Sequence, residues 1–215
     1  FVNEGQNNDW RYNTSKGLAN ITPIGDFKPM DETRDAYFYS ETHEVSNTAF
    51  TGTLVLKRPF AKVRVVTTDL NYLTNYATPT KAVVKYYHHE IFNDFNAVTR
   101  QLSTVRTEEP VEYNIVDSYY SNGYDADADK MTIFADYILA EDEWTEINFT
   151  LATYHGDDLI FENDFSTQIP VKRNHLTTIM GNVLTTGANI TVEVDNKFDG
   201  EYIRNWDDKV VALTT

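Results

Sequence analysis

The pattern of apolar and polar positions changes near residue 50. Before it, the chain is rich in Asn, Asp and Gly, with Trp10 and Tyr12 as aromatic anchors. Such residues favour turns and loops. After it, apolar residues recur at every second position in several stretches, which is typical of β-strands. We therefore predict an irregular N-terminal segment over 1–49, a β domain over 50–195 and a C-terminal tail over 196–215.

The stretches differ in how they alternate. Ala61, Val63 and Val65 alternate with Lys62 and Arg64, which predicts a strand with one buried face. Residues 83–88 (VVKYYH) instead indicate a strand that is buried on both sides. Further strands are predicted at 111–115, 133–139, 147–151, 159–161, 169–184 and 190–194, with a hairpin turn at 154–158. The last of these strands has the clearest alternation.

Residues 68–77 switch to helical spacing. Thr68 can cap a helix, and Leu70, Leu73 and Ala77 fall on one face before Pro79. We expect one short helix there. Six or more strands with turn signals between them and a single helix predict a mainly β protein, folded as a β-sandwich.

The charge of the chain excludes two classes of partner. Its 215 residues carry a formal net charge of −15 at pH 7, with no basic stripe that could neutralise phosphates. We therefore predict no nucleic-acid partner and no binding to an anionic membrane surface. The chain has no Cys, so disulfides and thiol catalysis are excluded. It begins at Phe1 without Met or a signal peptide, and we expect segment 1–49 to be the remnant of a longer, processed precursor.

One acidic segment has the character of a metal site. Asp125, Asp127 and Asp129 alternate after Asn122 and Gly123, and carboxylates in a loop can bind Ca²⁺. The Gly and Glu that complete an EF-hand loop are missing from their positions. We therefore interpret the segment as an acidic solvated loop and predict no metal site and no cofactor, with a calcium loop as the alternative.

The candidate catalytic groups lack partners at useful spacing. His88 and His89 are neighbours, so on a strand their rings point to opposite faces. His155 lies in the predicted turn, and no nucleophile motif accompanies it. We interpret the neighbouring carboxylates at 108–109 and 141–143 as parts of solvated loops rather than as the catalytic pair of a glycosidase. We predict no catalytic residues and no enzymatic activity. Three Trp residues could stack on sugar rings if exposed, although packing in the core or at an interface is the favoured interpretation: Trp10, Trp144 and Trp206.

Two longer segments carry a family resemblance. Residues 58–65 (RPFAKVRV) resemble the R-P-F-A-K strand of Bacteroidales fimbrillin-like proteins, the subunits of type V pili. Residues 169–179 (IPVKRNHLTTI) resemble the V-x-R-N-x-x-T-x-I segment of the same family, and 198–201 (FDGE) follow in the family's order. Weaker similarities lie at 34–37 (RDAY) and 136–139 (DYIL).

The resemblance implies a transthyretin-like antiparallel β-sandwich that is exported as a lipoprotein. It implies a structural subunit of a fimbria at the outer membrane, attached through an N-terminal lipid anchor that is removed or absent here. Its partners would be other fimbrial subunits, joined by β-strand exchange, and a host surface protein or glycan. The β-prone tail is the candidate donor strand, with assembly residues Lys209, Val210, Val211, Ala212 and Leu213. The alternative is a non-polymerising surface lipoprotein that binds a glycan or a host protein.

Overall fold

The computed structural model describes residues 2–3, 11–25, 28–44, 47, 52–73, 78–87, 91–105, 109–115 and 130–196. Its elements, with η for a 3-10 turn, are β1 (Val2–Asn3), β2 (Tyr12–Asn13), β3 (Thr22–Pro23), η1 (Glu32–Arg34), β4 (Ala36–Tyr37), β5 (Phe60–Thr67), η2 (Leu70–Tyr72), β6 (Lys81–Tyr87), β7 (Phe92–Phe95), β8 (Leu102–Val105), β9 (Val111–Asn114), β10 (Met131–Leu139), β11 (Thr145–His155), β12 (Asp158–Val171), β13 (Leu176–Asn182) and β14 (Ala188–Asp195).

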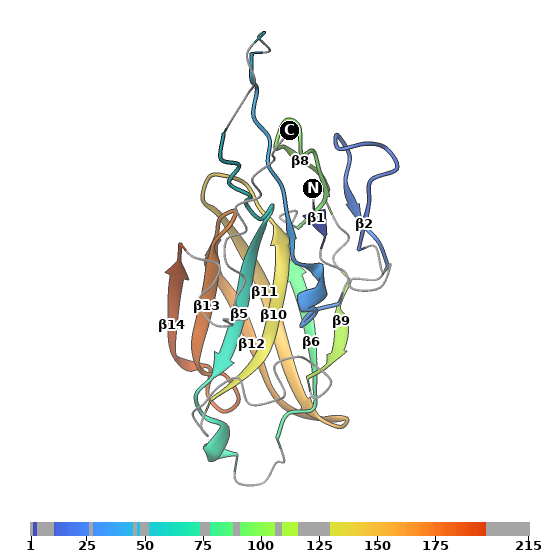
Figure 1. Ribbon diagram of the computed structural model, residues 1–215. Helices are drawn as coiled ribbons and strands as arrows, with labels where there is room; N and C mark the ends of the chain where they lie inside the picture. Colours follow the sequence, from blue (N-terminus) through green and yellow to red (C-terminus); the bar gives the residue numbers. More distant parts are fainter. Residues whose placement is uncertain are drawn as a thin grey trace.

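Two four-stranded sheets form the body of the molecule (Figure 1). The first has the order β10-β5-β13-β14, and the second has the order β12-β11-β6-β9. They lie face to face as two layers, which confirms the predicted β-sandwich. The first sheet is mixed, because β13 pairs with β5 in parallel. The other pairings described within the two sheets are antiparallel, as expected.

The main core lies between the two layers. The rings of Phe134 in the first sheet and Phe149 in the second are 5.4 Å apart between centroids. Tyr113 of β9 reaches across the same space, where its hydroxyl donates to the carbonyl of Ile133 in β10 at 2.7 Å. Apolar area removed from water between the sheets is the main stabilising contribution in a fold of this kind.

The burial of β5 differs from the prediction of one buried face. Val63 and Val65 face the second sheet and are fully buried, as expected. On the opposite face, however, Arg64 is only 4% exposed and Phe60 only 3%. The expectation was wrong because β5 is a central strand whose outer face is covered by other parts of the chain, so a charged residue there does not indicate contact with solvent.

The burial of β6 differs in the opposite sense. Ala82, Val84 and Tyr86 are buried, while the residues between them are only partly buried. The prediction of a strand buried on both sides was therefore wrong. β6 has one face on the core and one face toward solvent, as strands of an antiparallel sheet commonly do.

The short helix predicted over 68–77 is reduced to a 3-10 turn in the described residues. η2 spans Leu70–Tyr72, and Asp69 rather than Thr68 precedes it. Leu70 and Leu73 still pack against the core, as the spacing predicted. Residues 74–77 lie outside the described residues, and no α-helix occurs within the described part of the chain.

The turns between the last strands follow partly from the sequence. The predicted hairpin turn is confirmed between β11 and β12, where Gly156 has a φ of +58°. The single strand predicted over 169–184 is instead split into β12 and β13 by a turn at 172–175. Asn174 has a φ of +60° in that turn, a left-handed conformation that Asn tolerates better than most residues.

A second, smaller core joins the N-terminal segment to the sandwich. It combines Tyr12, Ile21 and Phe38 with Phe60 of β5 and Phe95 of β7. Within 1–49, the described elements are the four two-residue strands β1 to β4 and the 3-10 turn η1. The described part of the segment packs against the outer face of the first sheet. The boundary at residue 50 stays a prediction.

Candidate functional site

The two segments that carry the family resemblance lie next to each other. Because β5 and β13 are parallel neighbours, Lys62 pairs in register with Leu176. Just before these strands, the amide of Arg58 donates to Asn174 Oδ1 at 3.1 Å, and the amide of Asn174 donates to the carbonyl of Phe60 at 2.7 Å. The left-handed Asn174 thus closes the turn against the start of β5.

Arg58 binds the N-terminal segment. Its guanidinium forms a bidentate pair with Asp35, at 2.7 and 2.9 Å, and lies 4.5 Å from the centre of the Tyr37 ring. Burial lowers the pKa of Arg58, but the hydrogen bonds and the charge of Asp35 outweigh burial, and the pKa lies above its usual range. A bidentate, partly buried pair of this kind is stronger than an exposed ion pair.

Lys62 makes the second charged contact with the same segment. Its Nζ lies 2.7 Å from Glu32 Oε1 in η1 and 5.1 Å from the centre of the Tyr137 ring. The Tyr137 hydroxyl donates to the other oxygen of Glu32. Burial lowers the pKa of Lys62, and the neighbouring carboxylate of Glu32 opposes that effect. The segments 34–37 and 136–139, which carry the weaker similarities, therefore contact the two longer segments around the start of β5.

Arg173 joins the connections at the same end of the sandwich. Its side chain is 1% exposed, and it donates to the carbonyls of Ala140 at 2.8 Å and of Arg100 at 2.9 Å. Its guanidinium lies 5.7 Å from the ring of Phe38 and 5.2 Å from that of Phe95. Burial lowers its pKa, while the nearby acidic side chains raise it.

These contacts join separate segments of the chain to one another. The charged side chains described above form pairs between separate segments of the chain. In each pair the positive charge of an Arg or Lys is balanced by a carboxylate. Within the described residues, no group of three or more His, Asp or Glu is placed to hold a metal ion. The residues that carry the resemblance thus hold the N-terminal segment and the connecting turns against the first sheet.

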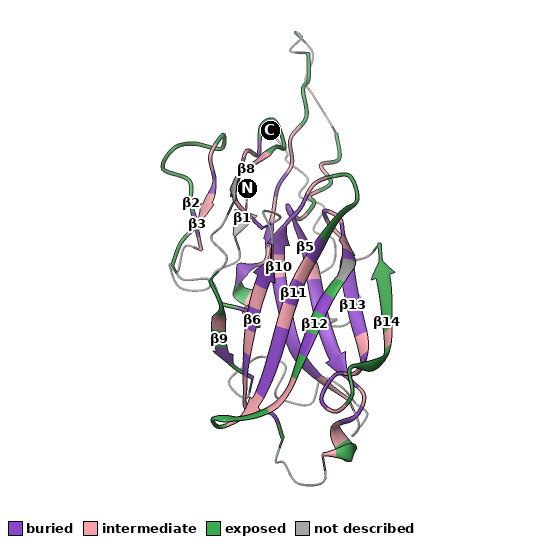
Figure 2. Ribbon diagram, turned by 180° about the vertical axis from the view of Figure 1, so that it is seen from behind, coloured by how far each residue is buried: buried purple, intermediate pink, exposed green. Residues whose placement is uncertain are grey.

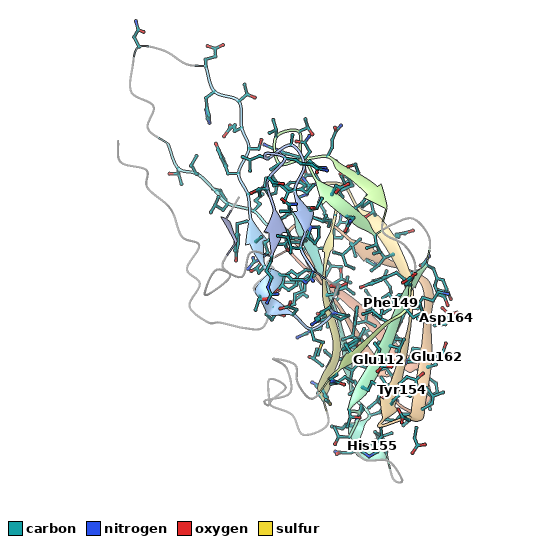
Figure 3. The ribbon with its side chains drawn as sticks, turned by 90° about the vertical axis from the view of Figure 1, so that its right-hand side faces the viewer. Glu112, Phe149, Tyr154, His155, Glu162 and Asp164 are labelled. Atoms are coloured by element: carbon teal, nitrogen blue, oxygen red, sulfur yellow. The ribbon has the colours of Figure 1, made fainter. Side chains whose placement is uncertain are left out.

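The candidate catalytic groups in the described residues bind other partners. His155 Nδ1 lies 3.2 Å from the carbonyl of Thr78, and Asp157 lies 3.1 Å from Lys81 Nζ. Figure 3 places His155 at the end of the second sheet, far from Phe149 in the core. Asp142 lies 3.1 Å from Arg173 Nη1. That the protein is not an enzyme stays a prediction.

Several predicted residues lie outside the described part of the chain. They are the calcium-loop candidates Asp125, Asp127 and Asp129, the assembly residues Lys209 to Leu213, and Trp10, Trp206, His88 and His89. Trp144 is described, and it is 50% exposed. Trp144 is therefore not packed in the core, and its packing at an interface stays a prediction.

Sequence reasoning missed the partners of the two motifs. Glu32 and Asp35 lie more than twenty residues before Lys62 and Arg58, and no periodicity links them. The signal that could have found them is the short similarity at 34–37, which contains Asp35 and Tyr37. Two of the motif's charged residues also occupy a central strand, where unpaired charges would be costly.

The chain matches a known family and is similar to several solved structures. The profile of DUF6562, described as a family of unknown function, matches residues 1–212. No curated protein matches the chain. A solved structure of a proposed cell adhesion protein from Bacteroides uniformis ATCC 8492 is 14% identical, with a TM-score of 0.38, over 66% of this chain and 52% of that one.

Two further solved structures are similar to the chain. A proposed cell adhesion protein of Bacteroides eggerthii DSM 20697 is 11% identical, with a TM-score of 0.32 and coverage of 66% and 56% of the two chains. One from Parabacteroides distasonis ATCC 8503 is 11% identical, with a TM-score of 0.28 and coverage of 66% and 52%. The chain spans about half the length of these structures.

The described residues contain no helix that is long and apolar enough to cross a membrane.

Proposed function

We propose that this chain, which belongs to the DUF6562 family of unknown function, is a structural subunit of a cell-surface fimbria that assembles by β-strand exchange. The observation that carries this proposal is the edge strand β14. Within the described residues, β14 pairs with β13 along one edge only. The opposite edge of β14 faces away from the sheet (Figure 2). An edge of this kind offers backbone groups that can pair with a donated strand.

The side chains of β14 support the same interpretation. Val192 pairs in register with Ile179, and Val194 pairs with Thr177, both of which are fully buried. Residues directly opposite each other on neighbouring strands share a face of the sheet. Val192 and Val194 therefore lie on the face that carries the core, yet they are 41% and 37% exposed. A donated strand would extend the sheet and bring apolar side chains to this face.

The charges on β14 favour a particular partner. Glu193 and Asp195 are exposed, so two copies of β14 would place like charges side by side. A strand that begins with Lys209 and continues with Val210, Val211 and Ala212 offers the opposite charge followed by apolar residues. The tail of a neighbouring subunit is therefore the partner we assign to this edge.

The cellular setting is part of the proposal and rests on the resemblance to fimbrillin-like proteins. The subunit lies at the cell surface, associated with the outer membrane through a lipid anchor on a precursor segment. Its partners are other fimbrial subunits, and the filament contacts a host surface protein or glycan.

Deletion of residues 209–215 tests the donor. We expect the full chain to form filaments, or ladders that resist SDS, and the shortened chain to remain a folded monomer. Negative-stain electron microscopy and solution mass give the assembly state, and thermal unfolding shows that the fold is kept. Filaments that persist after the deletion would exclude this donor segment.

A mixing experiment tests the acceptor. The double variant Val192→Asp/Val194→Asp keeps the tail but adds charge to the acceptor face, so it should not polymerise alone. Mixed with the tail-deleted chain, it should give a dimer and no longer species, because only one exchange is possible. Polymers of the double variant alone would show that β14 is not the acceptor.

The non-polymerising surface protein is the second candidate function. The exposed Trp144 favours it, because an exposed aromatic residue can contact a ligand.

A further inference from the structure

Trp144 lies exposed between two charged connections at one end of the sandwich. It directly precedes β11, and half of it faces solvent. The imidazole of His175 contacts it in a T-shaped arrangement, with 5.2 Å between ring centroids. The Nζ of Lys172 lies 5.4 Å from the centre of the indole. The three side chains come from the β10–β11 and β12–β13 connections.

The two connections are held together by Arg173. Its backbone amide donates to the carbonyl of Glu141, and its Nε donates to the carbonyl of Ala140, both at 2.8 Å. Its Nη1 lies 3.1 Å from Asp142. Thr145 also pairs in register with Val171, next to Trp144 and Lys172. A ligand that stacks on the indole would therefore meet a surface that is already ordered, which reduces the entropy cost of binding.

The surrounding polar groups can bind hydroxyls. His175 Nδ1 lies 2.7 Å from the carbonyl of Arg173, and a carbonyl only accepts, so Nδ1 carries the proton. In that tautomer Nε2 is an acceptor. The ammonium of Lys172 is a donor, and the exposed Glu143, which precedes Trp144 in the chain, carries a further acceptor. Donors and acceptors around an apolar ring are the features that a sugar requires of a protein surface.

The surplus of carboxylates at this end, which outnumber Lys172 and Arg173, disfavours acidic sugars. Glu141, Asp142, Glu143 and Glu146 lie in or beside the same connection, and the whole chain has a net charge of −15. Sialic or uronic acids would bring a further negative charge against these carboxylates, which is unfavourable. The chemistry therefore favours an uncharged saccharide.

We propose that Trp144, Lys172 and His175 form a binding site for a neutral saccharide. The apolar face of one sugar ring stacks on the indole, and its hydroxyls bond to Lys172 and to Nε2 of His175. Half of this indole faces solvent on an ordered support, so its aromatic surface is open to a ligand. The site does not depend on strand exchange, because β14 contributes none of the three side chains.

A printed array of defined neutral and acidic oligosaccharides tests the site with the full chain. We expect retention of neutral glycans and no preference for sialylated or uronic ones. For the neutral glycan that is retained most, calorimetry should show that Trp144→Ala raises Kd about tenfold or more, the loss expected for a central aromatic anchor. Trp144→Phe keeps an aromatic ring and should lose less.

Tyr72→Ala is the matched control, because Tyr72 is an exposed aromatic residue, at 71%, on η2 at the other end of the fold. It should bind as the unmodified chain does. The proposal is overturned if no neutral glycan is retained above the level of an unrelated acidic protein, if only acidic glycans are retained, or if Trp144→Ala binds as tightly as Tyr72→Ala. Thermal unfolding of each variant confirms that the chain is folded in every comparison.

Discussion

Strands β5 and β14 belong to the same sheet and have the same kind of sequence, but their surroundings are opposite. Both alternate Val with charged residues, over 61–65 in β5 and over 190–195 in β14. β5 lies between two strands, and even its charged residue Arg64 is 4% exposed. β14 lies at the edge, and even its Val192 is 41% exposed.

The difference teaches that alternation predicts a strand but not its burial. A strand in the middle of a sheet has neighbours on both sides, and other parts of the chain can cover its second face. Here η1 reaches the outer face of β5 through the pair of Glu32 with Lys62, and Asp35, between η1 and β4, pairs with Arg58 just before β5. β14 has no such cover within the described residues. Position in the sheet, which depends on long-range pairing, therefore decides the burial of both strands.

Loss of the contact between η1 and β5 should lower the stability of the fold more than the other changes proposed below. Glu32→Ala leaves the ammonium of Lys62 without its carboxylate partner in a site where its side chain is only 13% exposed. We expect the free energy of unfolding to fall by about 2–3 kcal/mol, less than the about 3–5 kcal/mol of a fully buried pair, because both side chains are partly exposed. Lys62→Met should cost less, because an apolar residue of similar length needs no partner. Urea unfolding measures each variant.

The double variant Glu32→Ala/Lys62→Met decides the cause. It should be about as stable as Lys62→Met alone, since the charge that needed Glu32 is gone. Asp157→Ala is the control, because it breaks a pair whose aspartate is fully exposed, and it should change stability far less. Equal losses for Glu32→Ala and Asp157→Ala would contradict the contrast between a covered strand and an exposed surface.

A smaller effect is expected from Tyr12, which packs over β5 with its ring centroid 5.8 Å from that of Phe60. Burial raises the pKa of the Tyr12 hydroxyl above its usual range, and the nearby Arg34 partly opposes this. Above about pH 10 the unfolded chain then loses this proton while the folded chain keeps it. Stability should fall with rising pH, by up to about 1.4 kcal/mol per pH unit for this group.

The Tyr12→Phe variant should remove this contribution. Its free energy of unfolding should depend less steeply on pH between about 10 and 11 than that of the unmodified chain. Tyr72→Phe changes an exposed residue and should leave the slope unchanged. Identical slopes for the Tyr12→Phe variant and the unmodified chain would show that Tyr12 is not buried against the sheet.

The local elements of the fold could be predicted because they depend on neighbours in the sequence. The turn at Gly156 and the strand that became β14 follow from turn residues and from period-two alternation. The split of residues 169–184 was missed, because Asn174 and its left-handed turn were read as part of a strand. In the described part of the predicted helix, residues 68–73, the structure has only a 3-10 turn at Leu70–Tyr72, which already brings Leu70 and Leu73 to the core.

The candidate site was predictable only in part. Residues 58–65 and 169–179 were recognised as special, but their role depends on contacts that the sequence does not display. Lys62 pairs with Glu32 and Arg58 pairs with Asp35, and the partners of each pair are more than twenty residues apart in the sequence. Such pairs form because the second face of β5 is covered, and that cover depends on the path of the whole N-terminal segment. The exposure of Trp144 likewise depends on how the two connections approach each other.

The smallest effect should come from β14 in the isolated chain, and it sharpens the contrast with β5. Val192→Thr/Val194→Thr changes two exposed side chains at a sheet edge, so the free energy of unfolding of the monomer should change by about 0.5 kcal/mol or less. Val63→Thr places a hydroxyl in the core of β5 and should cost about 1–3 kcal/mol. Urea unfolding of both variants at low protein concentration gives the comparison. A loss at β14 as large as that at Val63 would mean that a part of the same chain already covers the edge, in which case β14 cannot accept a strand from a neighbour without displacing it.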